Sequence, residues 1–146
     1  MKRIHNIVIC DERGNSLATT GDTSIYLGDR EYFLHHRQST ARGVFFSQPV
    51  KSKLDGEWSI PLSRRFNHPD GSFAGVVVAS IGSRYFSEFY RQFDNGAGGS
   101  VALMTAKGIV VARSPDNETY AGRDLSDRPL YRNPALQSAS GVYYFK

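Results

Sequence analysis

The sequence predicts an α+β protein in which helices pack against a central antiparallel sheet. Three observations lead to this fold class. Short apolar runs are separated by polar turns that contain glycine, two stretches without helix breakers have helical spacing, and parts of the N-terminal half recur near the C-terminus. A chain of 146 residues with 40% hydrophobic content can bury one good core. We therefore expect one complete domain followed by part of a second copy.

A strand pair is expected at the N-terminus. Residues 4–10 are rich in Ile and Val, and a polar turn containing Gly14 separates them from the short apolar stretch at residues 17–18. Cys10 is the only cysteine, so it has no partner for an internal disulfide. Because it lies within the apolar run, we expect it to be a small buried side chain.

A short helix is expected after a polar loop. Asp29 is a suitable N-cap, and residues 30–38 contain no helix breaker. The i, i+3, i+4 spacing places two aromatic rings and one imidazole on the same face. An arginine beside such rings suits a small anionic ligand, because the rings exclude water and the guanidinium binds a carboxylate or phosphate through two hydrogen bonds. The residues concerned are Arg30, Tyr32, Phe33 and His36.

Three strands and a second helix follow. Residues 43–47 form a short apolar run, residues 58–66 alternate, and residues 73–81 are the most strand-like stretch of the chain. The turn at residues 67–72 joins the last two strands antiparallel. Residues 83–93 then have the pattern of an amphipathic helix.

This second helix has Ser83 as its expected N-cap and carries a stripe of aromatic residues. We interpret the stripe as core or packing surface rather than a cofactor site. A ligand-free dimerisation or interaction module that used it as an interface is the main alternative to a binding domain. The stripe consists of Phe86, Phe89, Tyr90 and Phe93.

Part of the pattern recurs along the chain. Asp29-Arg30 returns as Asp127-Arg128, 98 residues later, and the apolar run 43–46 returns at the same offset as residues 141–144. The turn around Gly14 is echoed around Gly108, 94 residues later. Repeats of about 20 to 50 residues are typical of solenoids, so this longer period favours two copies of one domain.

We accordingly predict a first lobe over residues 1–95 and a partial second lobe over residues 96–146, with a glycine-rich linker where they meet. The second lobe should contain a hairpin, over residues 100–105 and 109–113, and then a polar loop over residues 114–127. Counterparts of the two long strands are missing from it. Its sheet should therefore have an exposed edge that is prone to pairing.

Composition and motifs exclude several classes of function. The excess of 18 basic over 14 acidic residues is small and spread along the chain, so no nucleic-acid partner is expected. No apolar run is long enough to span a bilayer, and the charged start leads directly into strand-like sequence rather than a signal peptide. The histidines do not converge, so we expect no metal and no cofactor. Without a Gly-x-Ser-x-Gly elbow or a paired set of acids, we expect no catalytic residues and no enzyme.

Several motifs in order resemble the double Cache sensor domains, the PAS-like extracytoplasmic sensors of bacterial membrane receptors. The resemblance covers nearly the whole chain, and it is strongest to sensors that precede diguanylate cyclase or histidine kinase output domains. It implies a PAS-like Cache fold with the membrane-distal lobe first, followed by a partial second PAS-like lobe. It also implies a periplasmic location in an inner-membrane protein, whose spanning helices lie outside this sequence, and is compatible with a homodimer. The motifs are Asp29-Arg30-Glu31-Tyr32-Phe33, residues 58–65, residues 70–77, residues 98–103 and residues 122–126.

The resemblance also implies a ligand site in the distal lobe. Ligand-binding members use an arginine and an aromatic residue two positions apart, and Arg30 and Tyr32 match this pair. Amino-acid binders tend to place an aspartate near the end of the long strand, where this chain has Ser80, so a carboxylic acid or similar small anion is the expected ligand. Arg64 and Arg65 lie on opposite faces of one strand, so at most one faces the ligand, and alternation leaves open which. The candidate ligand-binding residues are Arg30, Tyr32, Phe33, His36, Phe46, Ser63, Arg64, Arg65 and Ser80.

Overall fold

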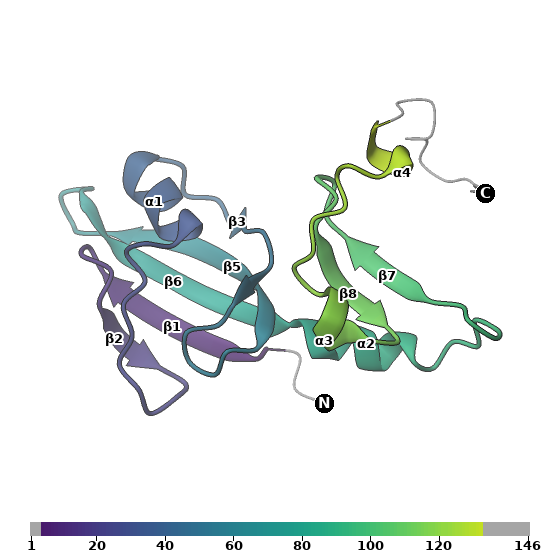
Figure 1. Cartoon of the computed structure of the whole chain (residues 1–146). Coiled ribbons are helices and arrows are strands. Elements are labelled where there is room, and N and C mark those ends of the chain that lie inside the picture. The colour runs from purple at the N-terminus through teal and green to yellow at the C-terminus, as the bar shows by residue number, and fades with distance from the viewer. Residues whose placement is uncertain (1–3, 133–146) are drawn as a thin grey trace.

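The computed structural model describes residues 4–132 and has the predicted α+β architecture, with a six-stranded antiparallel sheet followed by a two-stranded one (Figure 1). The strand order of the first sheet is β2-β1-β6-β5-β3, with β4 also paired to β5. The second sheet consists of β7 and β8. In chain order the elements are β1 (Asn6–Asp11), β2 (Ser16–Thr19), α1 (Glu31–Gln38), β3 (Phe45–Phe46), β4 (Val50–Lys51), β5 (Trp58–Asn67), β6 (Phe73–Gly82), α2 (Ser83–Tyr90), β7 (Val101–Met104), β8 (Val110–Ser114), α3 (Asn117–Tyr120) and α4 (Pro129–Arg132).

The first sheet unites the N-terminal strand pair with the three strands that follow it. β6 lies at its centre, paired with β1 from Asn6↔Ser80 to Asp11↔Gly75 and with β5 on its other side. A central strand has neighbours on both edges, which explains why β6 carries the most continuous apolar sequence in the chain. β4 was not predicted, because it is only two residues long and pairs with residues at the start of β5.

The core lies between α1 and one face of this sheet (Figure 1). Phe33 is completely buried there and meets Phe73 edge-on, with their ring centroids 5.6 Å apart. The predicted burial of Cys10 is confirmed, and its thiol donates a hydrogen bond to the Val76 carbonyl. Burial raises the pKa of this thiol. The core cluster comprises Val8, Cys10, Leu27, Tyr32, Phe33, Val76 and Val78.

The predicted N-cap of α1 is wrong. The helix begins at Glu31, and Arg30 occupies the N-cap position without a side-chain capping hydrogen bond. Asp29 instead forms an ion pair with Lys53, whose Nζ lies 2.6 Å from its carboxylate. A partner distant in the sequence therefore takes the carboxylate that local chemistry would have used as a cap.

Alternation along β5 is present, but its polar-looking face is the buried one. Ser59, Ser63 and Arg65 point into the α1 side of the sheet, whereas Arg64 is exposed on the other side. Burial of the polar face is tolerated because α1 supplies hydrogen-bond partners for Ser63 and Arg65. The opposite face of the sheet remains partly open, and Val77 at its centre is 37% exposed.

The second helix differs from its prediction in length, cap and packing. α2 ends at Tyr90 rather than at residue 93, and its N-cap is Gly82 without a side-chain hydrogen bond. Ser83 lies in the first turn and accepts a hydrogen bond from the Asn117 side chain at 3.0 Å. The helix packs mainly against β8 through a face where Ser83 is buried, whereas Phe89 is 45% exposed. The exposed part of the aromatic stripe is therefore not core.

The sequence repeat corresponds to a repeated hydrogen-bond pattern. In each copy the carbonyl of a hairpin glycine accepts a hydrogen bond from the amide of a leucine further along the chain. Leu27 donates to Gly14 at 2.7 Å, and Leu125 donates to Gly108 at 2.9 Å. Both glycines have positive φ, 93° and 88°, in the left-handed region that favours glycine. Each leucine is soon followed by an Asp-Arg pair and a helix, α1 in one copy and α4 in the other. The repeated run at residues 141–144 lies outside the described residues.

The second hairpin is confirmed as β7 and β8. The polar loop expected over residues 114–127 contains a short helix, α3, that was not predicted. No helix among residues 4–132 is both long and apolar enough to cross a membrane.

Candidate ligand-binding site

A small cavity lies beneath the N-terminal end of α1, between that helix, the sheet and the segment at residues 51–54. Its volume is about 30 Å³. Three of the candidate residues line it, namely Arg30, Tyr32 and Ser80. None of its lining residues is an aspartate or glutamate, so its charged groups are all basic. The other lining residues are Asn6, Val8, Ile25, Leu27, Val50, Lys51, Ser52, Lys53, Leu54, Ser59, Pro61 and Val78.

Arg30 is the charged group at the centre of this arrangement. One guanidinium nitrogen, Nη2, donates to the Lys51 carbonyl at 2.8 Å. Within the described chain no carboxylate forms an ion pair with it. Tyr32 is 4% exposed, and burial raises the pKa of its phenol, which therefore stays neutral. The guanidinium retains donors that an anion can accept from.

The second basic group beside the cavity is already neutralised. Lys53 Nζ lies 2.6 and 2.7 Å from the two carboxylate oxygens of Asp29 and donates to the Tyr26 carbonyl at 2.9 Å. The hydrogen bond from Lys53 holds the pKa of Asp29 below its usual value. Arg30 is consequently a better anchor for a small anion than Lys53.

Ser59 is a cavity residue that sequence reasoning missed. It is 1% exposed, and its hydroxyl has no hydrogen-bond partner among the described residues. A buried hydroxyl without a partner costs free energy, so it is a position where a bound molecule or a water would be favoured. Its spacing of four residues before Ser63 on an alternating strand was the available signal, since both side chains then share a face.

Four other candidates do not line the cavity and belong to the interior around α1. His36 Nε2 is hydrogen-bonded to Ser63 Oγ at 3.0 Å, and burial lowers the pKa of His36. Arg65 donates to Asn67 Oδ1 at 2.8 Å and to the His36 carbonyl at 3.2 Å. Phe33 fills the core. These contacts account for the four side chains without a ligand, except that His36 Nδ1 is buried and has no hydrogen-bond partner among the described residues.

The last two candidates lie elsewhere. Arg64 lines a groove of about 850 Å³ on the open side of the sheet, and its Nε donates to the Arg42 carbonyl at 2.9 Å. Phe46 is 67% exposed. Although this groove is the larger hollow, its wall is the outer face of β5 and β6 and it contains neither Arg30 nor Tyr32. The structure therefore brings Arg30, Tyr32 and Ser80 together at the cavity, whereas the adjacent Arg64 and Arg65 lie on opposite faces of β5 and both contribute to the lining of the groove.

The fold is that of a Cache-type sensor domain, as comparison with solved structures shows. The extracellular domain of the histidine kinase rpHK1S-Z16 is 33% identical, with a TM-score of 0.85 over 97% of this chain and 58% of that one. The ligand-binding domain of the Pseudomonas fluorescens chemoreceptor CtaA, solved with L-serine, is 15% identical with a TM-score of 0.61, over 84% of this chain and 52% of that one. The ligand-binding domain of the Pseudomonas aeruginosa PAO1 amino-acid chemoreceptor PctC, solved with GABA, is 14% identical with a TM-score of 0.61, over 86% of this chain and 55% of that one.

Sequence comparison gives the family of the C-terminal part. Residues 83–146 match the dCache_1-like family, described as a histidine kinase sensor domain. These comparisons confirm the resemblance to double Cache sensor domains that the motifs predicted. It spans little more than half the length of the three solved domains. No curated protein has significant sequence similarity to it.

Proposed function

We propose that this chain is the ligand-binding part of an extracytoplasmic sensor in a membrane-anchored receptor, and that it binds a small carboxylate beneath α1 with Arg30 as the anchor. The observation that carries the proposal is an arginine without a carboxylate partner at a cavity that has no acidic lining residue. The match of residues 83–146 favours a histidine kinase over a diguanylate cyclase as the output domain.

A carboxylate suits this cavity for electrostatic reasons. A guanidinium binds a carboxylate through two parallel hydrogen bonds, which are stronger than hydrogen bonds between neutral groups. The hydroxyls of Ser59, Ser80 and Tyr32 can supply further polar contacts. The remaining wall is largely aliphatic and would hold a short hydrocarbon chain.

The ligands of the solved neighbours carry two charged groups, of which only the carboxylate suits the lining of this cavity. L-serine in CtaA and GABA in PctC both carry a carboxylate and an ammonium group. An ammonium group is usually balanced by a carboxylate when it is buried, and this cavity offers none. A simple carboxylic acid such as propionate would therefore be preferred over an amino acid.

Ligand entry requires the cavity to widen. A volume of about 30 Å³ accommodates only one or two water molecules. The sheet is hydrogen-bonded on both sides of β6, whereas the wall at residues 51–54 is mostly a loop, whose contact with Arg30 is one hydrogen bond to the Lys51 carbonyl. A carboxylate that binds Arg30 competes with this carbonyl, so widening is expected on that side.

The proposal is tested by thermal unfolding, followed by circular dichroism, with a panel of small carboxylates, amino acids, amines and phosphates. A ligand at about 100 times its dissociation constant stabilises the fold by about 2.7 kcal/mol, which raises the melting temperature by several degrees. The shift should disappear in Arg30→Ala and persist in Arg37→Ala, a matched loss of an exposed arginine on α1. A shift that survives Arg30→Ala, or a flat panel with a well-folded sample, would count against it.

A second function, dimerisation, is favoured by one observation. Phe89 and Phe93 are 45% and 52% exposed and lie against each other, with ring centroids 5.4 Å apart. An exposed aromatic pair of this kind suits an interface between two copies. Under this proposal Phe89→Ala lowers the oligomeric state measured by sedimentation and leaves ligand-induced stabilisation unchanged. The division into lobes at residues 95 and 96 stays a prediction.

A further inference from the structure

We infer that the segment at residues 51–58 couples the state of the cavity to the second lobe, meaning here β7, β8, α3 and Gly122, which follows α3. The inference rests on the proposed function, because it assigns to ligand binding at Arg30 a route out of the first sheet. One end of this segment forms the cavity wall and its other end contacts the second lobe. The route runs from the hydrogen bond between Arg30 and Lys51 to the contacts of Glu57 and Trp58 with Arg84 and Gly122.

The cavity end of the segment is held through Arg30. The Lys51 carbonyl accepts the hydrogen bond from its guanidinium at 2.8 Å, and Leu54 packs against the core beneath α1. Asn6 also lines the cavity, and its side-chain amide donates to Ser52 Oγ at 3.4 Å and to Asp55 Oδ2 at 3.2 Å. A ligand that takes over Arg30 therefore acts on the segment directly.

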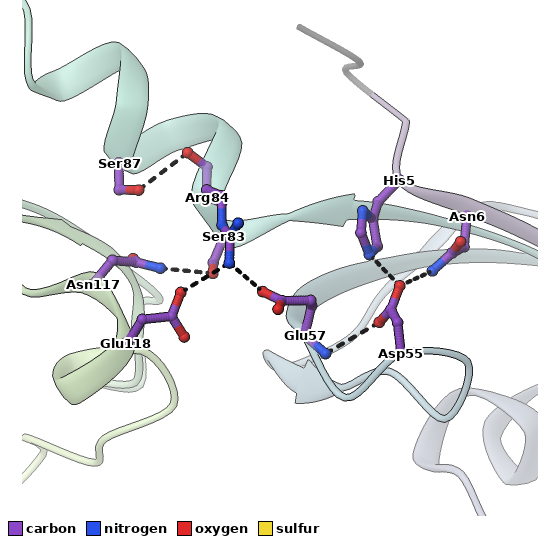
Figure 2. Close-up of polar contacts among 9 residues, drawn as sticks. All are labelled: His5, Asn6, Asp55, Glu57, Ser83, Arg84, Ser87, Asn117 and Glu118. Atoms are coloured by element: carbon purple, nitrogen blue, oxygen red, sulfur yellow. Dashed lines mark hydrogen bonds and ion pairs between the residues drawn. The ribbon is translucent and has the colours of Figure 1, made fainter.

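The junction end is held by charged groups around Arg84 (Figure 2). Arg84 Nη2 lies 3.1 Å from Glu57 Oε2 and 3.4 Å from Glu118 Oε1, so one guanidinium bridges the segment and α3. On the side of the first strand, Asp55 Oδ2 lies 2.6 Å from His5 Nε2. Figure 2 shows Asp55 and Glu57 on the same loop with their carboxylates directed to these different partners.

Apolar contact reinforces the junction. The ring of Trp58 lies against the backbone of Gly122, and any side chain at Gly122 would collide with that ring. Gly122 in turn donates its amide to the Val110 carbonyl at 2.8 Å, so it is tied to β8. A movement of Trp58 would therefore displace Gly122 and, through its hydrogen bond to Val110, affect the second sheet.

The two ends are joined by strand pairing. Lys51 and Trp58 are direct partners across β4 and β5, and Lys51 Nζ lies 5.8 Å from the centroid of the Trp58 ring. The residue that loses its hydrogen bond to Arg30 and the residue that packs on Gly122 thus face each other. Paired positions in a sheet move together because their hydrogen bonds and side chains are shared. Release of Lys51 from Arg30 should loosen the contacts of Trp58 and Arg84 with the second lobe.

Amide hydrogen exchange tests this coupling without a known ligand. Arg30→Ala removes the donor to Lys51, and the amides of Val110 and Gly122 should then exchange roughly 2- to 30-fold faster. The Thr20 amide, bonded to Ile7 at the far edge of the first sheet, should change less than twofold. Equal acceleration at all three amides would indicate general destabilisation and overturn the inference.

A second set of variants locates the route. The effect of Arg30→Ala on Val110 and Gly122 should be smaller in an Arg84→Gln background and nearly absent when Trp58→Leu is added. It should persist in Arg91→Gln, which removes another exposed arginine of the α2 region that forms no ion pair among the described residues. An effect that is undiminished in Arg84→Gln with Trp58→Leu would refute the assigned route.

Propionate as a probe separates this inference from the proposed function. If propionate raises the melting temperature and accelerates exchange at Val110 and Gly122 while it slows exchange at Thr20, the carboxylate site and its coupling to the second lobe are both supported. If it stabilises the protein and slows all three amides alike, the site is real and the coupling is refuted. If it does not bind, yet Arg30→Ala still accelerates the two amides of the second lobe selectively, the coupling stands and the choice of carboxylate fails.

Discussion

Replacement of Arg65 by alanine tests whether this buried arginine holds α1 on the sheet. Its side chain is 9% exposed, and its guanidinium lies 5.2 Å from the centroid of the Phe73 ring. It donates to Asn67 Oδ1 at 2.8 Å, to the His36 carbonyl at 3.2 Å and to the Ser39 carbonyl. Two of these acceptors are main-chain carbonyls at the C-terminal end of α1, where the last carbonyls of a helix lack intrahelical donors.

The magnitude follows from these contacts. A hydrogen bond to a charged group contributes about 1.5 to 3 kcal/mol, and buried carbonyls left without a donor add a desolvation cost. Because one guanidinium serves all three acceptors, the losses do not add fully. We expect Arg65→Ala to lower the free energy of unfolding by about 3 to 5 kcal/mol, which is large for a single substitution. At about 3 kcal/mol the melting temperature falls by roughly 10 °C.

Urea unfolding followed by circular dichroism measures this loss, and the adjacent arginine is a matched control. Arg64 is exposed and makes one hydrogen bond, to the Arg42 carbonyl, so Arg64→Ala should cost less than about 1 kcal/mol. Similar small losses for both variants would refute the structural role of Arg65. A loss of ligand-induced stabilisation with unchanged unfolding free energy would instead restore Arg65 as a ligand contact.

Two further predictions concern the interior around α1. Burial lowers the pKa of His36, so between about pH 6.5 and its folded pKa the unfolded chain binds a proton that the native state does not, and the free energy of unfolding falls as the pH is lowered through this window. His36→Gln should reduce this pH dependence, measured by urea unfolding at pH 7 and pH 5. An unchanged pH dependence in the variant would contradict the prediction. Phe33→Ala should lower the free energy of unfolding by about 3 to 5 kcal/mol because Phe33 is completely buried. Phe46→Ala should lower it by less than about 0.5 kcal/mol because Phe46 is 67% exposed. Comparable losses for the two variants would contradict the position of the core beneath α1.

Much of the fold was predictable because local patterns agree with the tertiary structure. The strand β6, the turn glycine Gly108 and the part of the repeat that lies within residues 4–132 correspond to observed elements or hydrogen bonds. Two caps were wrong because Asp29 and Ser83 found partners far away in the sequence. Propensity describes what a residue can do locally and cannot include a lysine that folding brings to it.

The candidate site was predictable only in part, for reasons that lie in β5 and the segment after α1. Alternation identified the two faces of β5, but the face with serines and Arg65 is buried because α1 satisfies its polar groups. Polarity alone therefore could not assign the inward face. The wall at residues 51–54 was missed because Lys51 contributes a main-chain carbonyl, which carries no signal in the sequence. Ser59 was missed although its spacing from Ser63 places both side chains on one face of β5. Arg30 and Tyr32 were predicted correctly as cavity residues because they contribute side chains, whose chemistry can be read from the sequence.

The open side of the first sheet has a consequence for how this protein can be assayed. Ile7 and Val77 are each 37% exposed, and the groove beside them has an aliphatic wall that includes Leu62 and Ala79. Environment-sensitive dyes, whose fluorescence increases when they bind an apolar surface, would bind such a face before any unfolding. Their fluorescence would start high and change little on heating, which would imitate a molten or aggregated sample. The single tryptophan, Trp58, offers a dye-free optical signal that a native protein with an open sheet face does not distort.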